Sequence, residues 1–155
     1  MTTPVLSEAE LRFVAGERRA VLATRSPHGQ PRLVPVCYVL AGQDEHGRPI
    51  LYSPLDEKPK RSSDPYQLAR VQDLLVLPEA TLLVDRWDED WSRLAWVRLY
   101  GTAELLEPQP REREEHAAAV AALREKYAQY HEQRLEARPV IRIVVTRAVS
   151  WGALE

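Results

Sequence analysis

The 155-residue chain has a single cysteine, six glycines, one phenylalanine and almost no net charge. The lone cysteine, Cys37, excludes an internal disulfide and a cysteine-based zinc cluster. Lys and Arg number 21 against 23 Asp and Glu, so the formal charge of −2 provides no overall basic field for nucleic acid. No apolar run reaches the roughly 18 residues that a bilayer-spanning helix needs. We therefore expect neither nucleic acid nor a membrane among its partners.

The residues that are abundant are those of a folded globular protein. Hydrophobic residues make up 45% of the chain and charged residues 28%, which is enough to bury a core without disulfides or metals. The first ten residues, MTTPVLSEAE, have neither the basic start nor the apolar segment of a signal peptide. We therefore expect one domain, residues 1–155, in the cytoplasm.

Turn residues and hydrophobic periodicity predict a mainly β fold. Ser7 followed by Glu10 is a capping box that begins a helix, and Asp64 followed by Pro65 begins another. Gly101 interrupts a long alternating segment, where we expect a bulge. The pattern lacks the rhythm of parallel crossovers, so we expect a six-stranded antiparallel barrel with flanking helices. The predicted strands cover residues 20–24, 33–40, 49–53, 80–87, 94–106 and 140–145, and the helices residues 7–17, 65–74 and 111–136.

A basic loop precedes the second predicted helix. Lys58, Lys60 and Arg61 stand within four residues and are followed by two serines. A helix N-terminus attracts anions through its free N–H groups and its dipole, and arginine adds bidentate hydrogen bonds. The pattern indicates a phosphate site, with a solvated loop neutralised by its acidic neighbours as the alternative.

Other chemical motifs are weak. The acidic residues between positions 85 and 90 lack the spacing of a calcium loop, and the four histidines lack ligand spacing, so we expect no metal site. No Gly-x-Ser-x-Gly elbow is present, and Cys37 lies among apolar neighbours, as a buried unreactive thiol does. The four tryptophans are many for this size, which favours a dimer interface or a wall for a ring-shaped ligand beside ordinary core packing.

Seven segments follow one another in a characteristic order within residues 7–106. They are Ala23-Thr24 before a Pro/Gly turn, then residues 32–36, 50–53, 58–61, 80–85, 88–93 and 96–103. This order resembles the pyridoxamine 5′-phosphate oxidase-like superfamily of flavin- and deazaflavin-binding split barrels. The likeness is closest to its branch of F420-dependent enzymes.

The resemblance implies a homodimer of split β-barrels with two cofactor sites at the interface. It implies coenzyme F420, a deazaflavin, as the cofactor, with FMN as the alternative. The implied cofactor-binding residues are Val34, Pro35 and Val36 along the ring, Tyr52 and Ser53 beside the ring and ribityl chain, Lys58, Lys60 and Arg61 around the phosphate, and Trp91, Trp96 and Arg98 from the second subunit.

The implied activity is oxidoreduction, with hydride transfer between the deazaflavin and a small organic substrate. The cofactor supplies the redox chemistry and the protein supplies position and electrostatics. No catalytic side chain is assigned, although Tyr52 and Tyr100 are candidate proton donors. Pyridoxamine phosphate oxidases carry basic residues near the C-terminus that residues 149–155 lack, so we expect a different substrate. The alternatives are a non-catalytic module that binds flavin, deazaflavin or haem, and a structural dimer with an empty cleft.

Overall fold

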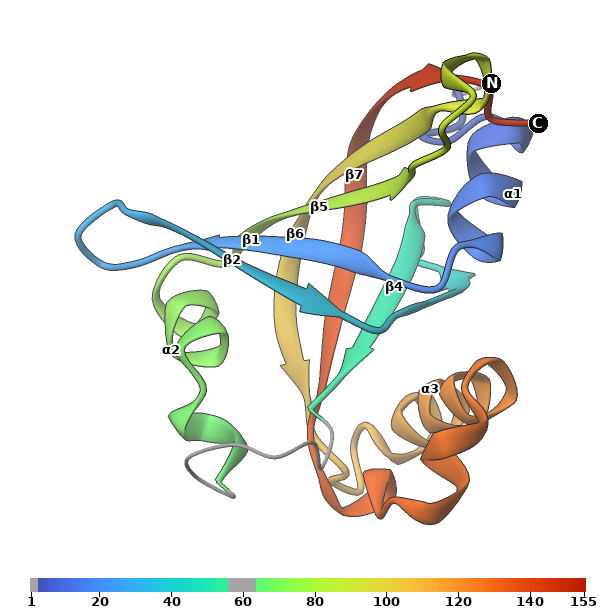
Figure 1. Cartoon of the computed structure of the whole chain (residues 1–155). Helices are drawn as coiled ribbons and strands as arrows, with labels where there is room; N and C mark the ends of the chain where they lie inside the picture. The colour runs from blue at the N-terminus through green and yellow to red at the C-terminus, as the bar shows by residue number, and fades with distance from the viewer. Residues whose placement is uncertain (1–2, 56–63) are drawn as a thin grey trace.

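The computed structural model describes residues 3–55 and 64–155, and strands dominate it (Figure 1). A mainly β fold with flanking helices is confirmed. The strands are β1 (Ala20–Arg25), β2 (Pro31–Val36), β3 (Val39–Gln43), β4 (Pro49–Pro54), β5 (Glu79–Arg86), β6 (Ala95–Leu106) and β7 (Val140–Gly152). The helices are α1 (Glu8–Gly16), α2 (Ala69–Val76) and α3 (Arg113–Lys126), with 3-10 turns η1 (Pro65–Gln67), η2 (Trp91–Arg93), η3 (Ala128–Glu132) and η4 (Leu135–Ala137).

All seven strands belong to one antiparallel sheet in the order β2-β1-β5-β6-β7-β4-β3. β2 and β3 are its two edges, so the sheet of the described residues is open rather than closed into a barrel. Figure 1 shows the strands strongly twisted, with the three helices set apart around them. No helix within residues 3–55 and 64–155 has the length and hydrophobicity needed to span a bilayer.

The predicted strand over residues 33–40 is wrong, which is why six strands became seven. The chain leaves the sheet at Cys37 and Tyr38, between β2 and β3. The backbone N–H of Tyr38 donates to the hydroxyl of Tyr127 (3.1 Å), and that hydroxyl lies 2.9 Å from the Tyr38 carbonyl oxygen. One side-chain hydroxyl thus replaces a strand neighbour, and the chain passes from pairing with β1 to pairing with β4.

Three other predicted boundaries also change. The second helix begins as the 3-10 turn η1 and continues as α2, while the third ends ten residues early and is followed by η3 and η4. The last strand continues to Gly152 instead of residue 145. The register between β6 and β7 shifts between Tyr100 and Gly101, which confirms the predicted bulge. At this bulge β7 has one residue more than β6, and this extra residue breaks the alternation of apolar side chains along β7. The strand predicted from that alternation therefore ended too soon, at residue 145.

The sheet buries a core on each face. On the inner face, Leu22 and Leu99 belong to the main core, which α1 and α2 complete through Val14 and Leu74. On the outer face, α3 covers only the end of the sheet formed by β3 and β4, where Leu123 belongs to a second core. The predicted capping box of α1 is confirmed, with the side chains and backbone of Ser7 and Glu10 bonded reciprocally.

No helix of residues 3–55 and 64–155 covers the rest of the outer face. The strand registers place outward-facing residues of β2, β1, β5, β6 and β7 side by side in rows. Several of them are exposed and apolar: Leu33 is 70% exposed, Leu83 37% and Trp151 53%. We call this surface the open face and define it by Leu33, Pro35, Val21, Ala23, Thr81, Leu83, Trp96, Arg98, Tyr100, Arg147, Val149 and Trp151.

Candidate functional site

The ends of β2 and β4 are joined by one hydrogen bond. The buried Ser53 hydroxyl donates to the carbonyl oxygen of Cys37 (2.8 Å), the residue that directly follows β2. Because β2 is an edge strand, no strand of the described part of the chain pairs with its backbone on the side away from β1. Of the predicted ring-binding residues, Val36 is buried, Val34 is half-buried and Pro35 is exposed. The structure therefore brings Ser53 to the end of the predicted ring-binding strand.

Tyr52 points the opposite way, into the second core under α3. Its hydroxyl donates to a carboxylate oxygen of Glu115 (2.5 Å). Burial, and then the hydrogen bond to Glu115, raise the pKa of the Tyr52 hydroxyl above its usual value, while Arg142 partly opposes the shift. The proton of Tyr52 is thus held tightly and shared with Glu115.

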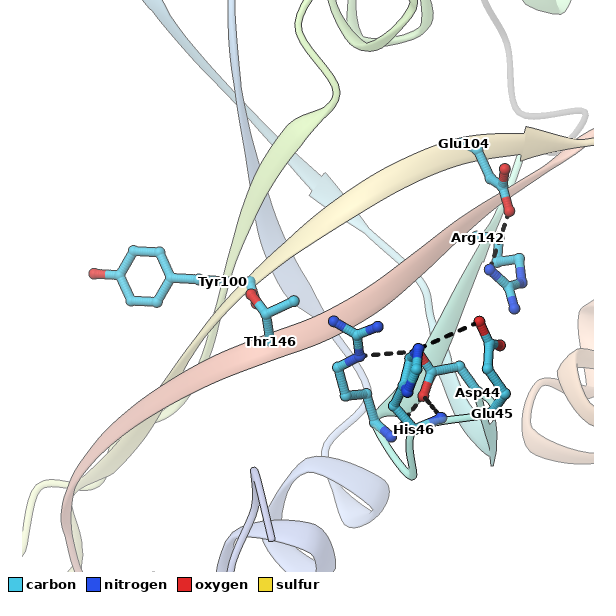
Figure 2. Close-up of polar contacts among 8 residues, drawn as sticks. Asp44, Glu45, His46, Tyr100, Glu104, Arg142 and Thr146 are labelled. Atoms are coloured by element: carbon cyan, nitrogen blue, oxygen red, sulfur yellow. Dashed lines mark hydrogen bonds and ion pairs between the residues drawn. The ribbon is translucent and has the colours of Figure 1, made fainter. Parts of the chain in front are cut away.

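Arg142 of β7 extends this network over the outer face. Its guanidinium donates to Glu115 (2.6 Å) and to Glu104 of β6 (3.0 Å). Figure 2 shows the Arg142–Glu104 pair beside the turn that carries Asp44, Glu45 and His46. A polar pocket of about 270 Å³ lies here, lined by Asp44, Glu45, Arg48, Thr102, Arg142, Val144 and Thr146. Its Asp44 and Arg48 are already paired with each other (2.9 Å), so the charges of this pocket are largely satisfied within the chain.

Trp96 and Arg98, the predicted cofactor-binding residues on β6, lie on the open face, away from β2. The registers place Pro35, Val21, Leu83 and Arg98 in one row across β2, β1, β5 and β6. Three strand spacings separate Pro35 from Arg98, which amounts to roughly 14 Å. Trp91, in η2, is 71% exposed. One chain therefore presents the two groups of predicted residues at separate places.

The predicted phosphate loop lies outside the described residues. Lys58, Lys60 and Arg61 therefore stay a prediction from the sequence. Among the described residues, the carboxylate of Asp73 on α2 is 1% exposed. It accepts a hydrogen bond from the Thr24 hydroxyl of β1 (2.8 Å) and contacts the Arg32 guanidinium of β2 (3.2 Å). This buried carboxylate fastens α2 to both strands of the β1–β2 hairpin.

Sequence reasoning missed Arg147 and Glu115 as neighbours of candidate residues. Arg147 lies opposite Tyr100 across β6 and β7, in the part of β7 beyond the predicted end of the last strand. Glu115 meets Tyr52 from a helix 63 residues away in sequence. A longer last strand would have revealed Arg147, whereas no local pattern shows the contact of Glu115.

The described residues include no cluster of histidine, cysteine and carboxylate side chains that could hold a metal ion. Among the histidines, His116 is buried and its Nε2 lies 2.6 Å from the Arg138 carbonyl oxygen. His46 is exposed beside Glu45 (3.7 Å). His28 and His131 are exposed as well.

Comparisons with known proteins identify a matching family and similar solved structures. The sequence profile of the family described as pyridoxamine 5′-phosphate oxidase matches residues 6–152. The structure is similar to a conserved hypothetical protein from Mycobacterium tuberculosis, with 25% identity and a TM-score of 0.69 over 98% of this chain and 88% of that chain. None of the curated proteins matches the chain.

Two further solved structures are similar and have different ligands in their names. A heme binding protein from Mycobacterium smegmatis is 25% identical, with a TM-score of 0.67 over 99% of this chain and 56% of that chain. An FAD-binding protein from Mesorhizobium loti is 18% identical, with a TM-score of 0.64 over 94% of this chain and 92% of that chain. The second likeness shows the fold alone.

Proposed function

The chain belongs to the pyridoxamine 5′-phosphate oxidase family, and we propose that it is an oxidoreductase that transfers hydride between a flavin-type cofactor and a small organic substrate. The observation that carries this proposal is the family match over residues 6–152. Within the family, the order of segments in the sequence resembles the F420-dependent branch most closely. We therefore propose coenzyme F420 as the cofactor, with FMN as the alternative.

The chain's own residues fit such a cofactor. On one side, the backbone of β2 at Val34, Pro35 and Val36 has no strand partner within residues 3–55 and 64–155, so it can lie against a flat ring and bond its polar edge. The hydrogen bond from Ser53 to Cys37 holds the end of β4 against this strand. These contacts can position a ring. The reaction needs no nucleophilic side chain, because the cofactor supplies the redox chemistry and the protein supplies the orientation.

We further propose that two copies of the chain associate through the open face. An uncovered sheet face with exposed leucine and tryptophan side chains is a typical association surface. Roughly 14 Å separates β2 from the β6 candidates in one copy. A second copy would therefore supply Trp96 and Arg98 to the β2 site of the first, and the exposed Trp91 would lie at the rim.

A bound deazaflavin supplies hydride chemistry at its central ring, and a flavin supplies hydride or single-electron chemistry. The protein's task is to orient the ring and substrate and to hold protons. Tyr52 is a poor donor of a proton to substrate because its hydroxyl is engaged by Glu115. Tyr100 projects from the open face, clear of the Arg142 network (Figure 2), and is our candidate proton donor.

The test is the absorption spectrum and mass of the small molecule that copurifies with the protein from a host that makes F420. Titration of the ligand-free protein with F420 and FMN, side by side, then ranks the two cofactors. Deazaflavin absorption and tighter binding of F420 are the expected results. Bound FMN alone, with no affinity for F420, would replace the proposed cofactor, and affinity for neither would refute the proposed function.

A haem-binding module is the second candidate, favoured by the likeness to the Mycobacterium smegmatis heme binding protein. An axial ligand would have to come from the four histidines or from another donor. His116 is buried against a backbone carbonyl. His28 lies on the turn that joins β1 to β2, His46 on the turn between β3 and β4, and His131 in η3. A Soret band on titration with hemin, lost in one histidine variant, would favour this candidate over oxidoreduction.

A further inference from the structure

Two guanidinium groups stack on one tyrosine ring at the centre of the open face. The Cζ atom of Arg147 lies 4.0 Å from the centroid of the Tyr100 ring, and that of Arg98 lies 5.6 Å from it and 5.2 Å from the centroid of the Trp96 ring. Tyr100 and Arg147 are direct partners across β6 and β7, and Arg98 precedes Tyr100 by two residues on the same strand face. Arg98 and Arg147 are thus diagonal neighbours, with Cα atoms roughly 7–8 Å apart.

Neither guanidinium has a carboxylate partner among the described residues. The Nε atom of Arg98 is buried and lacks a hydrogen-bond partner in the part of the chain that the structure describes. Arg142, farther along β7, shows the contrast, because it holds both Glu104 and Glu115. Two adjacent positive charges without a counter-charge repel each other, and a buried N–H without an acceptor costs free energy.

The acidic residue nearest to Arg98 in the registers is Asp85, which lies diagonally from it on β5 and forms no ion pair with it. Leu83 and Val149 lie directly opposite Arg98 on the two adjacent strands, and Thr81 lies opposite Tyr100. Apolar neighbours lower the local dielectric constant, so an anion placed here would be attracted more strongly than in water. The aromatic ring holds both guanidinium planes in place before any ligand arrives.

We propose that Arg98 and Arg147, stacked on Tyr100, form a binding site for the carboxylate or phosphate group of a small molecule. Guanidinium forks match the two oxygens of such a group and donate parallel hydrogen bonds to them. The buried Nε–H of Arg98 is the donor that this anion would satisfy. This assignment rests on the proposed function when it is carried to the reaction: in the oxidoreductase the anion is the acidic group of the substrate, which makes the substrate an organic acid or a phosphate ester.

The test is binding of inorganic phosphate and of citrate to the cofactor-free protein, followed by calorimetry and by the fluorescence of the adjacent tryptophans. We expect Arg98→Gln and Arg147→Gln each to weaken the affinity for one or both anions at least tenfold. Arg147→Lys should give an intermediate loss, because it keeps the charge and loses the fork. Arg113→Gln, an exposed position on α3, is the matched control and should leave the affinity unchanged. Binding should also weaken as NaCl is raised, since the attraction is electrostatic.

Unchanged affinity in the double variant, or no anion binding by the wild type, would overturn the proposal. Sedimentation of the same variants identifies the rival explanation. If anions do not bind and the double variant separates the two copies, the arginines are paired by carboxylates of the second copy instead. Titration of Arg147→Gln with F420 and FMN keeps the two proposals apart, because Arg147, unlike Arg98, is not among the proposed cofactor-binding residues. Retained cofactor binding by this variant would leave the proposed function standing while the anion site fails. Circular dichroism checks that each variant is folded.

Discussion

At the scale of single residues, Lys126 carries a charge that the fold opposes. Its Nζ atom is buried, has no hydrogen-bond partner among the described residues, and lies 3.8 Å from the centroid of the Tyr38 ring. Burial and then the nearby guanidinium of Arg18 lower the pKa of Lys126 to about 8, against the opposing effect of Cys37 and Glu17. The protonation of this lysine is therefore linked to folding.

The stability of the protein should rise with pH in the window that this pKa defines. An unfolded lysine has a pKa of about 10.4, so between about pH 8 and pH 10 the unfolded chain holds a proton that the folded chain has released. The free energy of unfolding then increases with pH. We expect the difference in this free energy between wild type and Lys126→Met to grow by about 1 kcal/mol in favour of wild type, a value reduced for the partly exposed side chain. Urea unfolding at pH 7.5, 8.5, 9.5 and 10 measures it, and a difference that stays flat with pH contradicts the shift.

Also at residue scale, the sequence predicts that Lys60 and Arg61 bind the cofactor phosphate. Removing a charged hydrogen-bond partner costs about 1.5–3 kcal/mol, or roughly ten- to a hundredfold in affinity. Lys60→Ala with Arg61→Ala should therefore weaken both F420 and FMN by at least tenfold in a fluorescence titration. Arg113→Ala is the control for loss of one exposed positive charge. Equal affinities of the double variant and wild type for both cofactors would show that the phosphate is held elsewhere.

At the scale of elements, the hydroxyl of Tyr127 decides where β2 ends and β3 begins. It accepts the N–H of Tyr38 and lies within hydrogen-bond distance of the carbonyl oxygens of Tyr38 (2.9 Å) and Arg18 (2.8 Å). The break it stabilises places Cys37 where Ser53 can bond to it. One side chain at the end of α3 thus links the partner change of the sheet to the candidate site.

Tyr127→Phe should destabilise the fold because it leaves the buried N–H of Tyr38 without an acceptor. An unsatisfied buried backbone group costs about 1–3 kcal/mol, so we expect a loss of that size in the free energy of unfolding by urea. Tyr66→Phe, at a tyrosine that is 37% exposed, is the matched control and should change stability by less than about 0.5 kcal/mol. A loss no larger than that of the control would show that the break between β2 and β3 does not depend on this hydroxyl.

At the scale of the whole molecule, the open face is a surface that the described part of one chain leaves uncovered. α3 covers one end of the outer surface and nothing in the described chain covers the other. Its residues come from five strands, and the rows they form depend on the sheet registers. Association through this face is also what would bring the β2 and β6 candidates into one site.

We expect the wild type to sediment as a dimer at micromolar concentration and Leu83→Arg to sediment as a monomer. Leu83 lies directly opposite Arg98, so a second positive charge there would be buried in the interface beside a like charge. A charge buried without a partner in an interface costs about 3 kcal/mol or more, which weakens association by over a hundredfold. Leu75→Arg is the control, since Leu75 is 61% exposed on α2 and outside the open face.

The monomeric variant should also bind the cofactor poorly, because its site would lack Trp96 and Arg98 of a second copy. A monomeric wild type, or equal effects of the two arginine substitutions, would refute association through this face.

Several features of this protein followed from its sequence alone. The alternation of apolar residues determined the mainly β class, the capping box of Ser7 and Glu10 determined the start of α1, and Gly101 determined the bulge. The order of short segments was enough to indicate the family that the profile match over residues 6–152 shows. These signals are local, because each depends on neighbours within a few positions of the chain.

Only the tertiary structure decided the rest. Whether residues 33–40 form one strand or two depends on a hydroxyl from residue 127, and the stacking of Arg98 and Arg147 on Tyr100 depends on a register between strands about 50 positions apart. The commitment of Tyr52 to Glu115 likewise needs α3 folded over β4. The physical reason is the same in each case. Hydrogen bonds and packing across the sheet join residues that are distant in the sequence, so they can override the local preference of a segment although its own residues show no corresponding pattern.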